Sequence, residues 1–462
     1  MAESWATLGV DLHLEPTGSG GLRRGLTDAL RDAVRTGRLA PGTRLPSSRS
    51  LATDLGIARN TVAEAYADLV AEGWLTARQG SGTRVTDHAV VPPAAATRHH
   101  REPARPAHSL IPGTPDLAAF PRTEWLKAAR RALATAPFHA LDYGDPRGRP
   151  ELRTALAGYL ARARGVRAAP ETVVITAGFS QALRILGTVL RARGVRTVAV
   201  ESYGLAPHRA LLRDAGLATP SLPYDELGTD PRPLTTEGAV LLTPAHQFPM
   251  GMPLHPDRRS AVVNWARRTG GLILEDDYDG EFRYDRQPVG ALQGLDPDRV
   301  VYLGTASKSL APGLRLGWMV LPPSLAEEAA AAKGGVDTVG ALEQLTLAEF
   351  LTSGAYDRHV RSSRLRYRRR RDALAASVTA RAPEVTVTGI AAGLHAVLRL
   401  PPGLEQSVIQ AAAWQGLALH GLSVYRHPEA VAEQMDALVV GYATPPDSAW
   451  AGALEALCRV LP

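Results

Sequence analysis

Apolar positions near the N-terminus recur first with the period of a helix and then with that of a strand. The helical periodicity predicts helices over residues 21–35, 47–56 and 58–72, and only a glycine turn separates the last two. Two strand-length runs follow, over residues 74–78 and 83–86, with a glycine-rich hairpin between them. Three helices followed by such a two-stranded wing are typical of a winged helix-turn-helix domain.

Short apolar runs alternate with helical stretches from Leu110 onward. This alternation predicts a largely parallel sheet with helices on both faces. From Leu342 onward long helices dominate and later strand runs follow, which predicts a smaller α+β subdomain. The runs expected to form the main sheet are Val173–Thr176, Val198–Val200, Ala239–Leu242, Leu272–Leu274 and Val300–Leu303.

The two patterns divide the chain into three parts. We expect an α+β winged helix-turn-helix over residues 18–86, a flexible linker over 87–109, and an α/β unit with its small α+β subdomain over 110–462. The linker contains several prolines and has no hydrophobic periodicity. Its adjacent His99 and His100 could suggest metal binding. No cysteine or carboxylate cluster accompanies them, so we expect a solvated linker and no metal site.

Composition and charge narrow the picture only slightly. The chain has 462 residues, 45% of them hydrophobic and 21% charged, which suits two or three globular domains. The net charge of +6 permits a nucleic-acid partner, but an arginine bias from a GC-rich genome explains it equally well. The single cysteine, Cys458, excludes an internal disulfide. No run reaches membrane-spanning length and no signal peptide is recognisable, so we expect a cytoplasmic protein without a membrane partner.

Polar residues occupy the positions of the winged domain that would face DNA. Recognition helices present their first residues to base edges in the major groove, and here these are Arg59, Asn60 and Thr61. Arg and Asn can each make bidentate contacts with bases. The alternative is a small helical domain whose arginines are merely solvated. The other candidate DNA contacts are Arg44 and Arg49, suited to phosphates, and Gln79 and Gly80 at the wing tip.

Reactive groups gather where two predicted strands end. The run that begins at Leu272 delivers Asp276 and Tyr278, and the run that ends at Leu303 is followed by Lys308 among hydroxyls. Ligands bind at the carboxyl ends of parallel strands, so these groups can converge on one molecule. A carboxylate, a phenol and a Schiff-base lysine are what pyridoxal 5′-phosphate (PLP) needs. Taken singly, the acidic cluster could equally be a metal site or a solvated loop, and the lysine a surface charge.

Candidate phosphate ligands lie on both sides of this lysine in the sequence. Ser180 and Gln181 lie in a strand-to-helix turn, where free backbone N–H groups bind phosphate, although such turns are common. Ser307 and Arg315 follow the later strand and can hold the same phosphate. Their presence favours a PLP site at Lys308 over a surface lysine.

The N-terminal motifs resemble the GntR family of transcriptional regulators. In that family, the positions that match Arg49, Arg59, Asn60, Thr61 and the wing around Gly80 contact DNA, and the resemblance implies the same roles here. The segments that carry it are Gly42-Thr-Arg-Leu-Pro-Ser-Ser-Arg49, Leu51-Ala-Thr-Asp-Leu-Gly-Ile-Ala-Arg59-Asn-Thr-Val62 and Leu69-Val-Ala-Glu-Gly-Trp-Leu75.

The C-terminal motifs resemble fold-type I PLP-dependent aminotransferases, and the combination resembles the MocR subfamily of GntR regulators, which includes GabR- and PdxR-type proteins. The motifs are Tyr143-Gly-Asp-Pro-Arg-Gly148 with Leu152-Arg153, Pro244-Ala-His-Gln-Phe-Pro-Met-Gly251, Glu275-Asp-Asp-Tyr-Asp279 and Ser307-Lys-Ser-Leu-Ala-Pro-Gly-Leu-Arg315.

This resemblance implies a role for each matching residue and a quaternary arrangement. Lys308 would carry PLP and Asp276 and Tyr278 would hold its ring. The subfamily forms head-to-tail homodimers in which the winged domain of one subunit packs on the large domain of the other. The residues implied at the phosphate are Ser180, Ser307 and Arg315, with Tyr143 reaching the phosphate of the partner subunit.

Departures from the aminotransferase pattern bear on function. Phe248 stands where aminotransferases have an asparagine, and His246 or Gln247 is a candidate replacement, with His246 also a candidate effector-binding residue. The strand expected near residue 437 lacks the usual arginine for a substrate carboxylate, so Arg426 and Arg209 are candidate effector-binding residues. Tyr203 is the candidate ring-stacking aromatic, although the usual motif around it is absent. These losses argue against efficient transamination of ordinary amino acids.

An arginine-rich run over residues 361–371 lies on a predicted helix. Additional contact with DNA is one interpretation. A solvated helix face, with Leu365 and Tyr367 turned inward, is favoured.

These features together predict a PLP-dependent, DNA-binding transcriptional regulator. Its effector would be PLP itself, in the control of vitamin B6 synthesis, or an amino compound that forms an external aldimine. Ligand binding would shift the population between domain arrangements with different affinities for operator DNA. The first alternative is an active aminotransferase with an appended DNA-binding domain. The second is a DNA-binding protein whose degenerate site no longer takes PLP.

Overall fold

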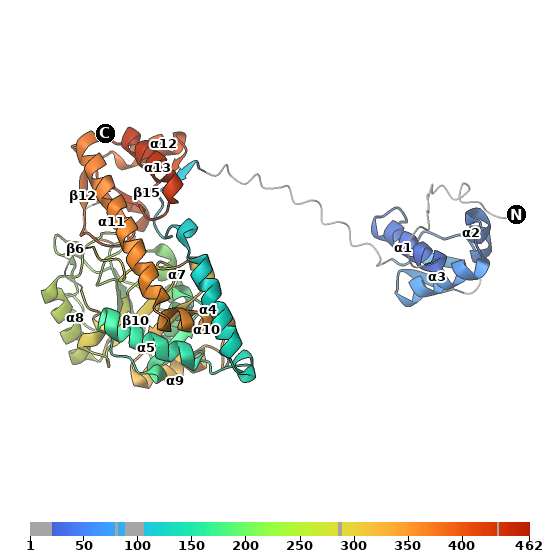
Figure 1. Ribbon diagram of the computed structural model, residues 1–462, viewed down its shortest axis with the longest axis horizontal. Coiled ribbons are helices and arrows are strands. Elements are labelled where there is room, and N and C mark those ends of the chain that lie inside the picture. The colour runs from blue at the N-terminus through green and yellow to red at the C-terminus, as the bar shows by residue number, and fades with distance from the viewer. Residues whose placement is uncertain (1–20, 79–81, 88–105, 285–288, 432–433) are drawn as a thin grey trace. The chain divides into compact units, whose positions relative to one another are not determined.

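A computed structural model describes residues 21–78, 82–87, 106–284, 289–431 and 434–462, and it separates the chain into two compact units, Met1–Arg105 and Pro106–Pro462 (Figure 1). The predicted wing-tip contacts Gln79 and Gly80 lie outside these described residues, as does most of the predicted linker.

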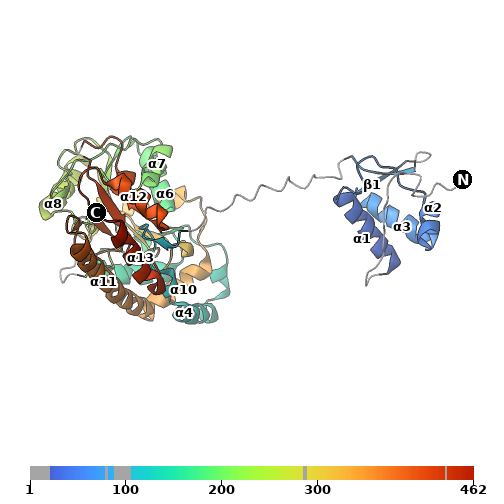
Figure 2. The same cartoon turned by 90° about the horizontal axis from the view of Figure 1, so that it is seen from above.

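The N-terminal unit has the predicted order of three helices and a hairpin. Its helices and hairpin lie together at the N-terminal end of the chain (Figure 2). Apolar side chains from all three helices and both strands form its core. Ser47 caps the second helix by accepting a hydrogen bond from the Ser50 N–H at 3.1 Å, and Gly56 ends it in a left-handed conformation. The elements are α1 (Leu22–Arg35), α2 (Ser48–Leu55), α3 (Arg59–Ala71), β1 (Leu75–Arg78) and β2 (Gly82–Val85).

The larger unit is built on a six-stranded sheet with the order β4-β11-β10-β9-β8-β5. Strands β5, β8, β9 and β10 pair in parallel as predicted, whereas β11 runs antiparallel to both of its neighbours and was not among the predicted strands. The strands are β4 (Val173–Thr176), β5 (Val198–Val200), β8 (Ala239–Leu242), β9 (Leu272–Asp276), β10 (Val300–Thr305) and β11 (Gly317–Val320).

Helices cover both faces of this sheet, as the alternating pattern predicts. One apolar core joins one side of the strands to α6, α7 and α9, and two further cores join the other side to α5, α8, α10 and α11. The helices are α4 (Arg122–Thr135), α5 (Pro150–Arg164), α6 (Phe179–Ala192), α7 (Ala206–Asp214), α8 (Pro256–Thr269), α9 (Pro323–Ala332), α10 (Ala341–Thr352) and α11 (Ala355–Arg381).

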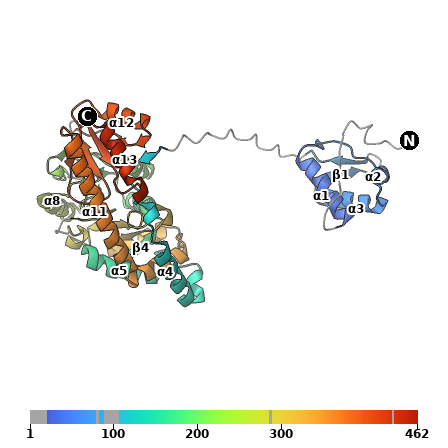
Figure 3. The ribbon, with the colours of Figure 1, turned by 45° about the horizontal axis from the view of Figure 1, so that its top comes forward.

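The C-terminal part forms the predicted α+β subdomain, a four-stranded sheet with the order β12-β13-β16-β15. Helix α11 runs from this subdomain toward α5 (Figure 3). The elements are β12 (Thr386–Thr388), β13 (Ala396–Arg399), α12 (Glu405–Trp414), β14 (Leu417–Ala418), β15 (His420–Gly421), β16 (Ala437–Val440) and α13 (Asp447–Val460).

The end of the predicted linker belongs to this subdomain. His108 and Ser109 form the short strand β3, which pairs in parallel with β14. The next residues are also held, because the Gly441 N–H donates to the Leu110 carbonyl at 2.7 Å.

The arginine-rich run on α11 differs from the expectation in one respect. Tyr367 is buried as predicted, but Leu365 is exposed, so its inward placement was wrong. Arg370 points inward instead, where it pairs with Asp116 at 2.9 Å and donates to the carbonyl of Pro445. The arginine-rich run is therefore not only a solvated helix face, because Arg370 is buried and joins α11 to the rest of the fold. Among the described residues, no helix combines the length and apolar character that crossing a bilayer requires.

Candidate cofactor site and DNA interface

A cavity of about 280 Å³ lies where the carboxyl ends of β8, β9 and β10 meet the start of α6. Parallel pairing sets Asp276 of β9 beside Leu303 of β10, so the polar residues that follow both strands reach the same edge. The sequence-predicted residues that line the cavity are Lys308, Asp276, Tyr278, Ser180, Ser307, Arg315, Tyr203 and Arg209.

Asp276 and Lys308 are two of the ionisable groups that line the cavity. Burial raises the pKa of Asp276 well above its usual value, and its Oδ1 atom has no hydrogen-bond partner among the described residues. Burial also lowers the pKa of Lys308, against the opposing effect of Asp276 and Asp279. The Lys308 Nζ donates to the Gly113 carbonyl at 2.5 Å. A buried carboxylate without a partner and an amine with a depressed pKa suit a protonated ring nitrogen and an aldehyde.

Hydroxyls, a helix start and an arginine gather on another part of the wall. Thr305 and Ser307 hydroxyls lie 2.8 Å apart. Gly178 precedes helix α6 and offers no side-chain cap, so the first backbone N–H groups of the helix remain available to an anion. Arg315 adopts a left-handed backbone conformation and donates to the Ala177 carbonyl beside this turn. Together these groups fit the phosphate of PLP.

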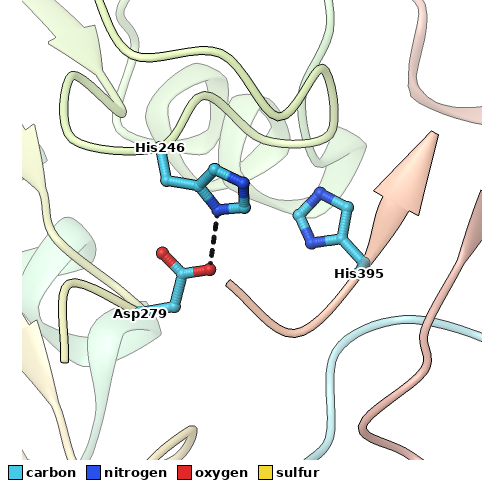
Figure 4. A group of neighbouring side chains, drawn as sticks. All are labelled: His246, Asp279 and His395. Carbon is cyan, nitrogen blue, oxygen red and sulfur yellow. Dashed lines mark hydrogen bonds and ion pairs between the residues drawn. The ribbon is translucent and has the colours of Figure 1, made fainter. Parts of the chain in front are cut away.

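A buried group of polar residues, His246, Asp279 and His395, lies behind Tyr278, and Figure 4 shows these three side chains. The Tyr278 hydroxyl lies 3.0 Å from Nδ1 of His246, and the same nitrogen lies 2.8 Å from Asp279 Oδ2. His395 lies beside His246 and bonds the Pro249 carbonyl at 2.9 Å. Ligand atoms of the two histidines and Asp279 lie within 4.8 Å of one another, a grouping that could hold a metal ion, but each residue already makes a hydrogen bond.

Four predicted residues do not line the cavity. The amide of Gln181 bonds Ala177 N–H and the Thr338 hydroxyl instead. Arg426 donates to the Ala430 carbonyl at 2.7 Å, and His246 lies behind Tyr278. Tyr143 is 89% exposed in the single chain, so it is free to reach another subunit.

The structure also brings in residues that the sequence did not single out. His208 packs against Phe179 with ring centroids 4.5 Å apart, and burial lowers its pKa to about 4, with Lys308 adding to the effect. Glu201 accepts hydrogen bonds from Thr243 and Gln247, and burial raises its pKa to about 7. The remaining unpredicted wall residues include Pro112, Gly113, Leu205, Leu394 and His395. Their contributing segments are distant in sequence, so no local motif signals them.

Arg209 is a buried guanidinium on the cavity wall. It donates to the Gly204 carbonyl at 3.0 Å, and no carboxylate among the described residues lies within ion-pair distance. Burial and nearby Arg213 lower its pKa. A buried cation of this kind favours an anionic ligand group.

The arginines of the N-terminal unit fall into two sets. Arg23 of α1 binds Asp68 of α3 at 2.6 Å, and Arg31 of α1 binds Glu72, directly after α3, at 2.7 Å, so the two pairs join these helices. The predicted DNA contacts are instead exposed or half-exposed, and no ion pair among the described residues engages their arginines. They are Arg44 before α2, Arg49 on α2, and Arg59, Asn60 and Thr61 in the first turn of α3.

Family models match both units of the chain. The model described as bacterial regulatory proteins, gntR family, matches residues 22–85. The model for aminotransferase class I and II matches residues 113–431.

Individual relatives share both parts. The chain is 37% identical over 405 residues to the HTH-type pyridoxine biosynthesis transcriptional regulator PdxR of Corynebacterium glutamicum, covering 87% of this chain and 88% of that protein. It is 34% identical over 437 residues to the probable rhizopine catabolism regulatory protein MocR of Rhizobium meliloti, covering 87% and 86%.

A solved structure extends the comparison to the large unit. The α-aminoadipate aminotransferase LysN of Thermus thermophilus, complexed with N-(5′-phosphopyridoxyl)-L-leucine, is 27% identical with a TM-score of 0.67, over 76% of this chain and 91% of that one. The winged helix-turn-helix, the PLP-type cavity and these relatives together establish that the chain belongs to the MocR subfamily of GntR transcriptional regulators, whose aminotransferase-type unit takes PLP as its cofactor.

Proposed function

We propose that this protein is a cytoplasmic regulator that binds operator DNA through its winged unit and adjusts that binding when PLP, alone or with an amino compound, occupies the large unit. The observation that carries the proposal is the unpartnered Asp276 oxygen beside Lys308 in a cavity of about 280 Å³. An orphaned buried carboxylate costs stability unless a cation meets it, and a protonated pyridine nitrogen supplies that cation.

Different residues of the cavity would contact different parts of the proposed cofactor. Lys308 would hold the aldehyde carbon, Asp276 the ring nitrogen and Tyr278 the neighbouring ring oxygen. The phosphate would be held by Ser180, Ser307 and Arg315, with the α6 N-terminus beside them. PLP, when bound, supplies an electron-withdrawing ring and an aldehyde that captures amines.

Arg209 supports an anionic effector group. Its guanidinium lines the same cavity as Lys308 and has no carboxylate partner among the described residues. An amino compound with a carboxylate or another anion would place its amine at Lys308 and its anion at Arg209. If PLP alone is the effector, Arg209 gains no such anionic partner. Arg209→Ala should therefore change how operator binding responds to an amino compound, and leave its response to PLP alone unchanged.

An exposed apolar surface supports a homodimer. It comprises Leu126 and Leu133 of α4, Phe138 and Leu141 of the following 3₁₀ turn (η3, Phe138–Leu141), and Tyr143, and α10 packs against α4 beside it. Phe138 is 98% exposed in the single chain. Large apolar groups gathered in this way mark protein interfaces, and a second subunit here would also receive Tyr143.

The proposal is tested by separating cofactor binding from DNA binding. Lys308→Ala removes the amine, so titration with PLP should no longer give the absorption band of lysine-bound PLP, whereas exposed Lys127→Ala should leave it intact. Arg59→Ala should weaken operator binding by roughly tenfold or more, since one bidentate base contact contributes about 1–3 kcal/mol. Arg35→Ala is the matched control, because it removes a similarly exposed charge that pairs with Asp32.

The expected result is two independent losses. Lys308→Ala should keep an intact winged unit but lose the dependence of operator binding on PLP. The absence of any PLP band in the unaltered protein would overturn the proposal. Steady turnover of an amino donor by the unaltered protein, with operator binding indifferent to PLP, would favour a working aminotransferase instead.

A further inference from the structure

We propose that Asp279 and His246 form a positioning pair that directs the phenolic proton of Tyr278 into the cofactor cavity. The inference rests on the proposed PLP site, because the direction of this proton matters only to a group that occupies the cavity. Neither Asp279 nor His246 lines the cavity itself.

The hydrogen-bond distances fix the proton of His246. Asp279 Oδ2 is an acceptor and lies 2.8 Å from Nδ1 of His246, so Nδ1 carries a proton. A protonated Nδ1 has no free lone pair. The Tyr278 hydroxyl oxygen, 3.0 Å from the same nitrogen, therefore cannot donate to it and shares its N–H with Asp279 instead. The phenolic O–H then has two possible acceptors, the Asp279 carboxylate, which also interacts with the phenol, and a group in the cavity. Because Asp279 already accepts from His246, we assign the proton to the cavity.

Packing holds the imidazole in this position. The side chains of His246 and Asp279 are 3% and 2% exposed. A methyl group at Gly393 would come within 2.1 Å of His246 Cε1 and 2.6 Å of Asp279 Oδ2, so the backbone of residue 393 closes directly against the pair. His395 packs on the other side, with ring centroids 5.1 Å apart (Figure 4). The ring cannot turn away without moving these neighbours.

The surroundings of Tyr278 make a directed proton useful. The titratable groups that face it are Asp276, Asp279, Glu201, His246 and Lys308. Several of these are acceptors that compete for the phenolic proton. If the phenolic O–H already points into the cavity, the side chain does not have to reorient when an oxygen of the ligand binds beside it.

The test is the pH midpoint at which the absorption of bound PLP changes, measured in single and double variants. Tyr278→Phe removes a donor to the ring oxygen and should raise the midpoint by about one unit, a tenfold change in the ionisation constant. Asp279→Asn is isosteric and lets Nδ1 lose its proton, so it should shift the midpoint in the same direction. The double variant should match Tyr278→Phe alone, because the pair acts only through the phenol.

Two further variants separate a positioning role from a structural one. Thermal unfolding followed by circular dichroism first establishes that His246→Asn and Asp279→Asn both fold. His246→Asn should then shift the pH midpoint as Asp279→Asn does. His420→Asn is the matched control. It removes an equivalent imidazole 2.8 Å from the Tyr425 hydroxyl, outside the cavity, and should leave the midpoint unchanged.

Three outcomes contradict the proposal in different ways. A downward shift in Asp279→Asn would mean that the phenol donates to Asp279 and not to the cavity. Additive shifts in the double variant would mean that Asp279 acts independently of Tyr278. Loss of the PLP band in the unaltered protein would overturn the PLP site itself and the positioning role with it.

Discussion

Two adjacent carboxylates at the end of β9, Asp276 and Asp277, have different surroundings and therefore different roles. Successive side chains of a strand point to opposite faces. Asp277 turns toward Arg164, which it binds through both oxygens at 2.6 and 3.0 Å, and it also accepts from Tyr302 at 2.8 Å. Asp276 turns toward the cavity with one oxygen unpartnered. One residue therefore stabilises the fold and its neighbour is left available to a ligand.

Substituting each residue should separate these roles. Asp277→Asn leaves Arg164 buried without its charge partner and should lower the free energy of unfolding by roughly 3–5 kcal/mol. Asp276→Asn should change the stability of the ligand-free protein little but weaken PLP binding by tenfold or more. Urea unfolding and PLP titration measure the two effects. Equal loss of stability in both variants would contradict the division.

The sequence assigns Asp276 to the PLP ring but does not reveal the structural role of Asp277. The partner of Asp277, Arg164, lies 113 residues away, so no local motif signals the pair. His246 illustrates the same limit, since its role depends on Asp279, 33 residues distant, and on the space left by Gly393. Lys308 and Tyr278 could be predicted from the sequence because each lies within a short contiguous motif.

At the scale of elements, the junction of α5 with α11 is built around Glu281. Its carboxylate lies 3.1 Å from the Tyr356 hydroxyl and 3.4 Å from that of Tyr159. Burial, with Asp277 adding to it, raises the pKa of Glu281 from its usual 4.5 to about 7. The folded protein therefore holds a proton that the unfolded chain releases at a lower pH.

This junction should make stability depend on pH. Because the folded pKa is raised, the contribution of Glu281 is greatest below pH 4.5 and declines as pH rises toward 7. The decline amounts to about 3 kcal/mol. Glu281→Gln removes the titration, so its Tm should fall less than that of the unaltered protein between pH 5 and pH 8. Parallel pH profiles for the two proteins would show that Glu281 does not titrate in this range.

Elements with strong periodicity were predictable from sequence, and those without it were not. The helices of the winged unit follow their apolar positions closely, with α3 spanning Arg59–Ala71 against an expected 58–72. Helix α11 carries so many arginines that its inward face is ambiguous, and the burial of Arg370 depends on Asp116, 254 residues earlier. Strand β11 lies between β10 and β4 in the sheet and runs antiparallel to both, a placement that the alternation of strands and helices does not predict.

At the scale of the whole molecule, fold class was accessible because two unrelated patterns follow one another along the chain. The alternation of strands and helices predicts the layered sheet, and the three helices with a wing predict the DNA-binding unit. Subunit association is a different matter, because the surface around Phe138 becomes recognisable only when the folded chain leaves it exposed.

Disrupting that surface should dissociate the proposed dimer. Phe138→Asp places a charge in the exposed apolar group and should yield monomers in sedimentation or light-scattering measurements. PLP binding should weaken in those monomers, since Tyr143 of the partner would be lost. Trp414→Asp is a matched control, because Trp414 is 91% exposed on α12. A monomeric unaltered protein would contradict the dimer proposal.

The hydrogen bond between Lys308 and Gly113 has a mechanical consequence. Gly113 is the fifth residue after His108, where strand β3 begins, so the chain between them spans at most about 18 Å. Pro112 packs against Gly441 in the same short stretch. We expect a ligand bonded to the lysine nitrogen to change its hydrogen bond to the Gly113 carbonyl. The large unit would then respond to the ligand at residues 108–113, close to where this unit begins.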